Sequence, residues 1–134
     1  MDKIRFVNPT TLRKPTKSYS QGILIPLGTA EMMFLTGQVA QDLDGNVIAP
    51  NDAQKQTEVI YERISDILID GGMSLENVVK AQIFLTNIAD GPTVSKIRDQ
   101  IFKSAKPVST LVEVTNLVKP GCCVEIEVIA VKLL

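Results

Sequence analysis

The chain has 134 residues, of which 45% are apolar and 22% charged, and its formal net charge is -1. This size and composition are typical of one globular domain spanning residues 1–134, and they exclude a disordered or collagen-like chain. Because cations are scattered and balanced by carboxylates, the sequence also lacks the basic footprint of proteins that bind nucleic acid.

The start of the chain predicts neither a secretory signal nor a membrane anchor. Residues Met1–Arg5 contain no apolar core of the kind that a signal peptide requires. The longest apolar stretch, Gly22–Gly37, is interrupted by a proline and a glutamate and is too short and broken to span a bilayer. We therefore expect a cytoplasmic protein without a membrane partner.

Short strands followed by a loop are predicted for the first third of the chain. Two apolar runs of strand length, Ile23–Ile25 and Met32–Leu35, are separated by the turn-forming residues proline, glycine and threonine. The polar segment Asp42–Asn46 contains an Asp-Gly pair followed by asparagine, which predicts a loop.

A helix is predicted after this loop. Either Asn51 or Asp52 can cap the free amides of a first turn, and the pair Gly71–Gly72 ends the pattern. Between them, apolar residues recur at helical spacing, at Val59, Ile60, Ile64, Ile67 and Leu68.

The second half predicts a strand, a helix and two more strands. Segment Asn77–Thr86 alternates with a period of two, which predicts a half-buried strand with one apolar face formed by Val79, Ala81, Ile83 and Leu85. A helix follows over about Pro92–Ser104. Two runs rich in β-branched residues, Thr110–Val114 and Cys123–Lys132, are joined through the turn-forming Val118–Gly121. This order predicts one sheet with both helices on one face, an α/β or α+β architecture.

Several classes of chemistry are excluded by composition. The chain has no histidine, which removes serine-histidine triads, cysteine-histidine nucleophiles and histidine-based zinc sites. It also lacks the glycine motifs that hold phosphates. Cys122 and Cys123 are adjacent, so on a strand they would point to opposite faces, and a mutual disulfide is not expected. Without a second ligand pair, ordinary packing explains them better than a metal site does.

Two glutamates are the most informative polar residues. Glu125 and Glu127 lie two positions apart on a predicted strand, so their side chains share a face. Unless both are well solvated, their repulsion raises the pKa of one carboxyl, which is a common way to prepare a group for proton transfer. The alternative is a strand with one wet face on which both glutamates only increase solubility.

Four segments of the chain occur in the order and at the spacing that a known family shows: Ser18–Gly22, Phe34–Gln38, Pro107–Val114 and Val124–Ala130. Together they resemble the Rid family of reactive intermediate deaminases, also called YjgF-like or endoribonuclease L-PSP proteins. Val78–Leu85 is similar to the strand that this family places between its two helices. The resemblance implies a chorismate-mutase-like fold assembled as a homotrimer, with a small-molecule metabolite in each of three clefts between subunits.

The resemblance also implies an activity and a set of site residues. Enzymes of this family hydrolyse 2-aminoacrylate-type enamines and imines to 2-oxo acids and ammonia, without a metal or organic cofactor. By position, Glu125 corresponds to the glutamate that positions or activates water, and Tyr19, Thr36, Gly37 and Thr110 correspond to residues at the cleft. Tyr19 could instead be a half-buried strand aromatic, and Thr36 and Gly37 could serve only strand geometry.

One departure from the family pattern affects the expected function. The family's carboxylate-binding arginine is replaced by Ser109, and its cleft asparagine corresponds best to Ser95. A guanidinium gives a carboxylate two parallel charge-assisted hydrogen bonds, and losing such a partner typically weakens binding by about 1.5 to 3 kcal/mol. Lys106 is three residues away in the sequence and is not counted as a substitute.

Two functions therefore stay open from sequence. The first is an imine or enamine deaminase, a hydrolase acting on C–N bonds, with weak or altered use of carboxylate substrates. The second is a non-catalytic trimer that binds a small metabolite in the same clefts. A ribonuclease activity, which one family name suggests, is disfavoured because the chain has no basic patch and no histidine for acid-base work.

Overall fold

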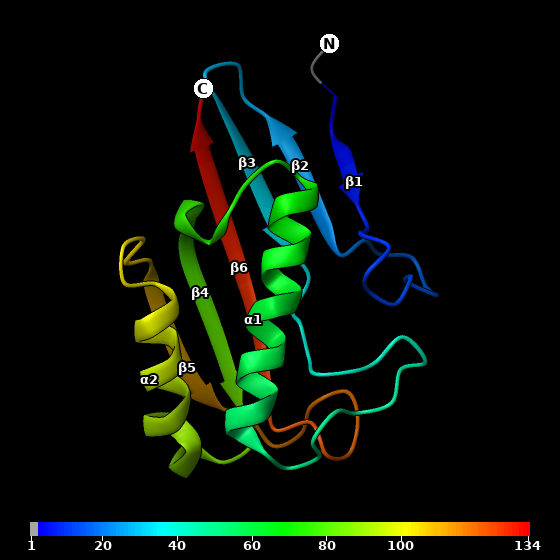
Figure 1. Cartoon of the computed structure of the whole chain (residues 1–134), viewed down its shortest axis with the longest axis vertical. Helices are drawn as coiled ribbons and strands as arrows, with labels where there is room; N and C mark the ends of the chain where they lie inside the picture. The colour runs from blue at the N-terminus through cyan, green and yellow to red at the C-terminus, as the bar shows by residue number, and fades with distance from the viewer. Residues whose placement is uncertain (1–2) are drawn as a thin grey trace.

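The computed structural model of the chain describes residues 3–134 and contains one mixed six-stranded sheet and two α-helices (Figure 1). The strands are β1 (Arg5–Val7), β2 (Gly22–Pro26), β3 (Ala30–Leu35), β4 (Val78–Leu85), β5 (Val108–Glu113) and β6 (Val124–Leu133), and the helices are α1 (Ala53–Asp70) and α2 (Gly91–Ile101). The strand order is β1-β2-β3-β6-β4-β5. Neighbouring strands are antiparallel except β4 and β5, which are parallel and connected through α2.

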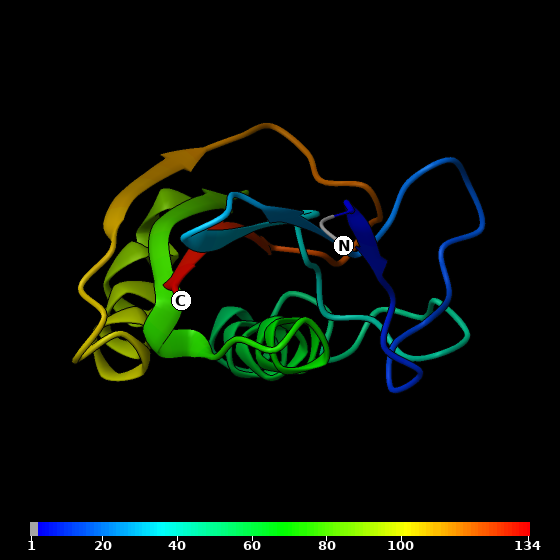
Figure 2. The same ribbon diagram turned by 90° about the horizontal axis from the view of Figure 1, so that it is seen from above.

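Both helices cover the same face of the sheet, as Figure 2 shows from above. The core lies between the helices and this face, where fully buried residues from both layers meet, among them Ile60, Ile64, Ile83 and Ile126. The predicted single sheet with two helices on one face is confirmed. Within residues 3–134, no helix is both long and apolar enough to cross a membrane.

The first predicted helix is confirmed, and the structure identifies its cap. The side chain of Asp52, rather than that of Asn51, accepts a hydrogen bond from the backbone N–H of Lys55. At the other end, the backbone N–H of Gly71 bonds to the carbonyl of Ile67, 3.1 Å away, and the next glycine has a φ of +81° that ends the helix.

A β-bulge changes the predicted faces of β4. Val79 was expected in the core but is 43% exposed, whereas Val78 is 2% exposed. The pairing of β4 with β6 shifts register between Val78 and Lys80, so an extra residue there turns Val79 away from the core. The other three residues expected on the core face are buried as predicted: Ala81, Ile83 and Leu85.

Other element boundaries also differ from the predictions, and one strand was not predicted at all. The second helix ends at Ile101 rather than Ser104, and turns lead from there to β5. The predicted final strand begins at Val124, so Cys123 precedes it; both cysteines are buried and free. The edge strand β1 was not predicted, because three residues are too few to show a periodic pattern.

Candidate functional site

A short loop holds Gly37 against Glu125. The loop of residues 36–38 follows β3, and its Gln38 exchanges two main-chain hydrogen bonds with Ile126, at 2.8 and 3.1 Å. Ile126 directly follows Glu125 on β6, so this pairing brings the loop alongside the glutamate. A Cβ added to Gly37 would lie 2.9 Å from the carboxyl carbon of Glu125, so a larger residue at position 37 would require the Glu125 side chain to move from this position.

The environment of Glu125 favours its protonated form. The carboxyl is half-buried, and this burial, together with the charge of Glu127, raises its pKa above the usual range. Burial is the larger cause. Glu127 itself is exposed, so the two glutamates on this face have different environments. A carboxylate that is a stronger base than usual is suited to taking a proton from water.

Thr36 connects the loop to the segment that carries Tyr19. Its hydroxyl donates to the carbonyl of Ser20 at 2.5 Å, and its backbone N–H donates to the carbonyl of Gln21 at 2.9 Å. Because the hydroxyl proton is used in this way, Thr36 is left as an acceptor toward any ligand. Tyr19 is 49% exposed, so its ring is not a core residue.

A buried polar network supports this loop from the helix side. The side-chain N–H groups of Gln38 donate to Gln21 Oε1 at 2.8 Å and to the carbonyl of Thr36 at 2.9 Å. Arg63 of α1 donates from Nε to Gln38 Oε1 at 3.2 Å and from Nη1 to the carbonyl of Gln41 at 3.1 Å. The side chains of Gln21 and Gln38 are 4% and 2% exposed, so these bonds replace water for groups that the fold has buried.

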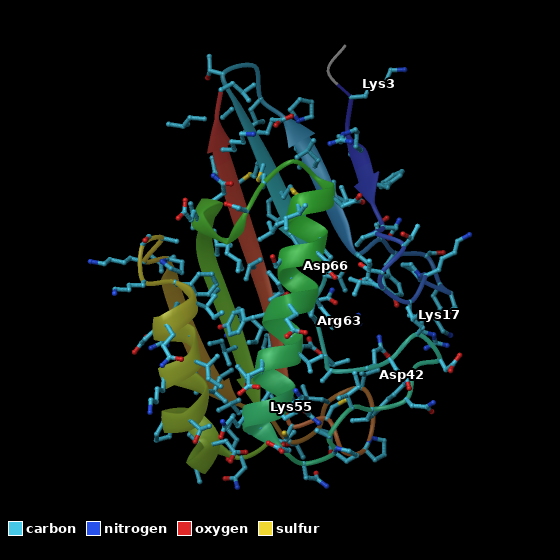
Figure 3. The ribbon with its side chains drawn as sticks, in the orientation of Figure 1. Lys3, Lys17, Asp42, Lys55, Arg63 and Asp66 are labelled. Carbon is cyan, nitrogen blue, oxygen red and sulfur yellow. The ribbon has the colours of Figure 1, made fainter. Side chains whose placement is uncertain are left out.

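Arg63 is a charged residue in the core that sequence reasoning missed. It is 6% exposed, and it lies on the side of α1 that faces the loop, as Figure 3 shows. Within residues 3–134 it forms no ion pair. Burial lowers its pKa, while the nearby Asp66 and Tyr19 oppose that change. The available signal was a single arginine inside the apolar stripe of a helix, next to Ile64.

Ser109 lies on the opposite face of the sheet from Glu125, whereas Thr110 pairs with Gln82, the neighbour of Glu127, and lies on the same open face as Glu125. On β5, Ser109 pairs with Ala81, whose side chain is buried under the helices, so Ser109 is on the helix side of the sheet edge. Glu125 pairs with Phe84 of β4. Phe84 follows the buried Ile83, and because side chains alternate along a strand, Phe84 and Glu125 both lie on the opposite, open face of the sheet. One copy of the chain therefore brings Thr36, Gly37 and Glu125 together, but it does not bring Ser109 to them.

Comparisons with known proteins agree with this architecture. The family model described as endoribonuclease L-PSP matches residues 10–132. A RutC family protein of Pyrococcus abyssi is 33% identical over 119 residues, which cover 89% of this chain and 90% of the relative. A 2-iminobutanoate/2-iminopropanoate deaminase of Bos taurus is 32% identical over 114 residues, 85% of this chain and 80% of the relative.

A solved structure agrees over nearly the whole chain. The crystal structure of a Rid-family protein of unknown function from Yersinia pestis has a TM-score of 0.84 and 32% identity, and the match covers 96% of this chain and 98% of that one. Sequence and fold thus agree with each other from β2 to β6, and the chain belongs to the endoribonuclease L-PSP family, which comprises the Rid and YjgF proteins.

Proposed function

We propose that the protein hydrolyses small imines, and the enamines that tautomerise to them, to carbonyl compounds and ammonia. The observation that carries this proposal is Glu125, a half-buried carboxylate with a raised pKa beside a glycine that leaves room for it. The similarity to the Bos taurus deaminase supports the same reaction class.

The reaction needs one group that accepts and then returns a proton. Glu125 takes a proton from water as the water oxygen bonds to the carbon of the protonated imine (C=NH2⁺), and the imine nitrogen becomes a neutral amine. The same carboxyl then returns the proton to that nitrogen, the C–N bond breaks, and the hydroxyl gives its proton to the departing ammonia, which leaves as ammonium as the carbonyl forms. A carboxyl with a raised pKa performs both proton transfers more readily than an exposed one, because its pKa lies closer to neutral pH.

A site that includes both Glu125 and Ser109 requires two copies of the chain. The two residues lie on opposite faces of one sheet, so Ser109 of one copy can meet only Glu125 of another. The open face also carries exposed apolar residues that a second copy would cover, namely Phe6, Phe34, Val108 and Val112. A homotrimer with one cleft between each pair of copies satisfies both requirements.

The replacement of arginine by Ser109 favours a second candidate function. Ser109 is exposed and offers one neutral hydroxyl where the resemblance to the Rid family implies a guanidinium. A trimer of this kind could hold a small metabolite in its clefts without hydrolysing it. The deaminase is preferred because a binding role does not explain why Glu125 is desolvated against Gly37.

Mixed assemblies test the proposed site directly. Two variants, Glu125→Gln and Ser109→Asp, are each expected to be inactive, the first without its base and the second because it repels a carboxylate. If they are unfolded together and refolded at equal amounts, about a quarter of the clefts combine an intact Ser109 with an intact Glu125 from the neighbouring copy. About a quarter of the wild-type rate of ammonia release from an enzymatically generated enamine is therefore expected.

Two controls accompany this experiment. The native mass should be about three times the 14.6 kDa chain mass. Each variant refolded alone should release no ammonia above the rate without protein. A stable monomer, or no recovery in the mixture, would exclude a site shared between copies. Wild-type protein that binds 2-oxo acids but releases no ammonia above the rate without protein would favour the metabolite-binding role.

A further inference from the structure

The edge of the sheet carries a hollow that the proposed proton transfer does not use. It has a volume of about 560 Å³ and lies where the end of α2 and the turn after it meet the start of β5. We call it the edge hollow, and its walls include Arg98, Asp99, Phe102, Lys103, Lys106 and Ser109.

Positive charge is concentrated in the edge hollow. Three cationic side chains and one carboxylate line it, although the chain as a whole has a net charge of -1. Lys103 and Lys106 are exposed, whereas the side chain of Arg98 is only 25% exposed. A concave surface with this excess of cations attracts small anions, and the partly desolvated arginine is the group best suited to bind one directly.

The contacts of Arg98 leave one edge of its guanidinium available. Nε and Nη2 donate to one oxygen of Asp99, at 3.1 and 2.9 Å, and Nη1 lies 3.5 Å from the hydroxyl oxygen of Ser109, at the long limit of a hydrogen bond. A guanidinium has five N–H donors, of which these contacts use three. Within residues 3–134, the remaining two, one on Nη1 and one on Nη2, have no partner and are available to the oxygens of a carboxylate.

The backbone beside the edge hollow is held in an unfavourable conformation. Lys106 has a φ of +47°, in the left-handed region that lysine rarely adopts, and it directly precedes Pro107, which disfavours helical conformations at that position. Its backbone N–H bonds to the carbonyl of Phe102 at 3.0 Å, which closes the turn at the end of α2. Strain of this kind is found more often at ligand sites than elsewhere.

We propose that the edge hollow binds the carboxylate of a small 2-oxo or 2-imino acid, and that Arg98 of α2 supplies the guanidinium that β5 lacks at Ser109. The choice of a carboxylate rests on the proposed deaminase function. A cation in the last turn of a helix also complements the helix dipole, but that role requires neither the contact with Ser109 nor a concave cationic surface.

Equilibrium binding of stable 2-oxo acids tests this site without relying on activity. The trimer labelled with ¹⁵N is titrated with pyruvate and 2-oxobutanoate, and the affinity and the positions of the shifted amides are recorded. Arg98→Gln should weaken binding by about tenfold or more, because a charge-assisted pair is lost. The affinity of Arg98→Lys should lie between those of wild type and Arg98→Gln, because lysine keeps the charge but lacks the parallel donors of a guanidinium. Lys96→Gln is the control, since Lys96 is an exposed cation on the same helix outside the edge hollow.

The outcomes separate this inference from the proposed function. Saturable binding that depends on Arg98, with shifts at the start of β5, supports the inference even if the protein releases no ammonia. Equal affinity of wild type and Arg98→Gln overturns it, even if the protein is an active deaminase. Binding of inorganic phosphate but not of 2-oxo acids, or shifts confined to the open sheet face, overturns it as well.

Discussion

The loop of residues 36–38 and the start of β5 carry the two halves of the proposed cleft, and the fold holds them very differently. Thr36 and Gln38 are tied to three neighbouring elements by backbone and side-chain hydrogen bonds, several of them buried. Ser109 lies on an edge strand, is exposed, and has one long contact to a helix side chain. The half that holds Glu125, the proposed catalytic carboxylate, is built into the core, whereas the half proposed to select the ligand is on the surface.

This difference explains how the substrate anchor can change while the fold does not. A substitution at an exposed edge position typically alters stability by less than about 0.5 kcal/mol. A change at Gly37 or Gln38 disturbs packing or leaves buried groups without partners. The fold therefore does not require an arginine at the position of Ser109, and the role proposed for Arg98 leaves the part of the site that holds Glu125 unchanged.

The largest expected effect comes from the core-anchored half. Glu125→Gln should lower the rate of ammonia release by about 10² to 10⁴-fold without changing the native mass of the protein, because an amide cannot accept a proton from water. Glu127→Gln is the control and should be nearly silent, since Glu127 is exposed. Equal losses in the two variants would show that the wrong glutamate has been assigned.

Stability measurements sharpen the comparison between the two halves. Gln38→Met should lower the free energy of unfolding by at least about 2 kcal/mol, because the buried Arg63 and Gln21 lose partners. Ser109→Ala should change it by less than about 0.5 kcal/mol. Urea unfolding of both variants measures this, with the exposed Gln54→Met of α1 as the control. Similar losses of unfolding free energy in Gln38→Met and Ser109→Ala would show that the loop of residues 36–38 is held no more firmly than the start of β5.

Restoring an arginine on β5 tests whether the surface half limits activity. In an Arg98→Gln background, where the proposed anchor is absent, Ser109→Arg should raise kcat/KM for a 2-iminopropanoate-type substrate by about tenfold, equivalent to about 1.4 kcal/mol. The measurement is pyruvate release, corrected for hydrolysis without protein. A correctly assembled double variant without any gain would mean that position 109 does not face the bound carboxylate.

The smallest effect is the pH dependence contributed by Glu125. Its pKa is raised in the folded protein, so between the unfolded and folded pKa values the folded state binds more protons than the unfolded one. The contribution of Glu125 to the free energy of unfolding therefore falls as the pH rises from the ordinary pKa of 4.5 through the higher pKa of the folded state. Relative to wild type, Glu125→Gln should be more stabilising at pH 7 than at pH 4 in urea unfolding. The opposite sign would indicate that Glu125 gains a favourable partner on folding.

Much of the fold follows from local patterns in the sequence. Apolar residues at helical spacing between Asp52 and Gly71 determine α1 because they must be buried together, and the alternation in β4 and β6 determines which residues face the helices. The same alternation places Glu125 and Glu127 on one face. The bulge at Val79 escaped prediction, because it depends on how β4 pairs with a strand far away in the sequence.

The assembled sheet decided what the sequence could not. The resemblance implied a cleft between subunits for Ser109 and Glu125, but only strand pairing shows that the two residues lie on opposite faces of the sheet, so that a shared site requires two copies. The position of Arg98 beside Ser109 and of Arg63 beneath the loop likewise depends on how the helices pack across the sheet. Contacts between residues far apart in the sequence arise only from tertiary packing, and periodicity within one segment carries no information about them.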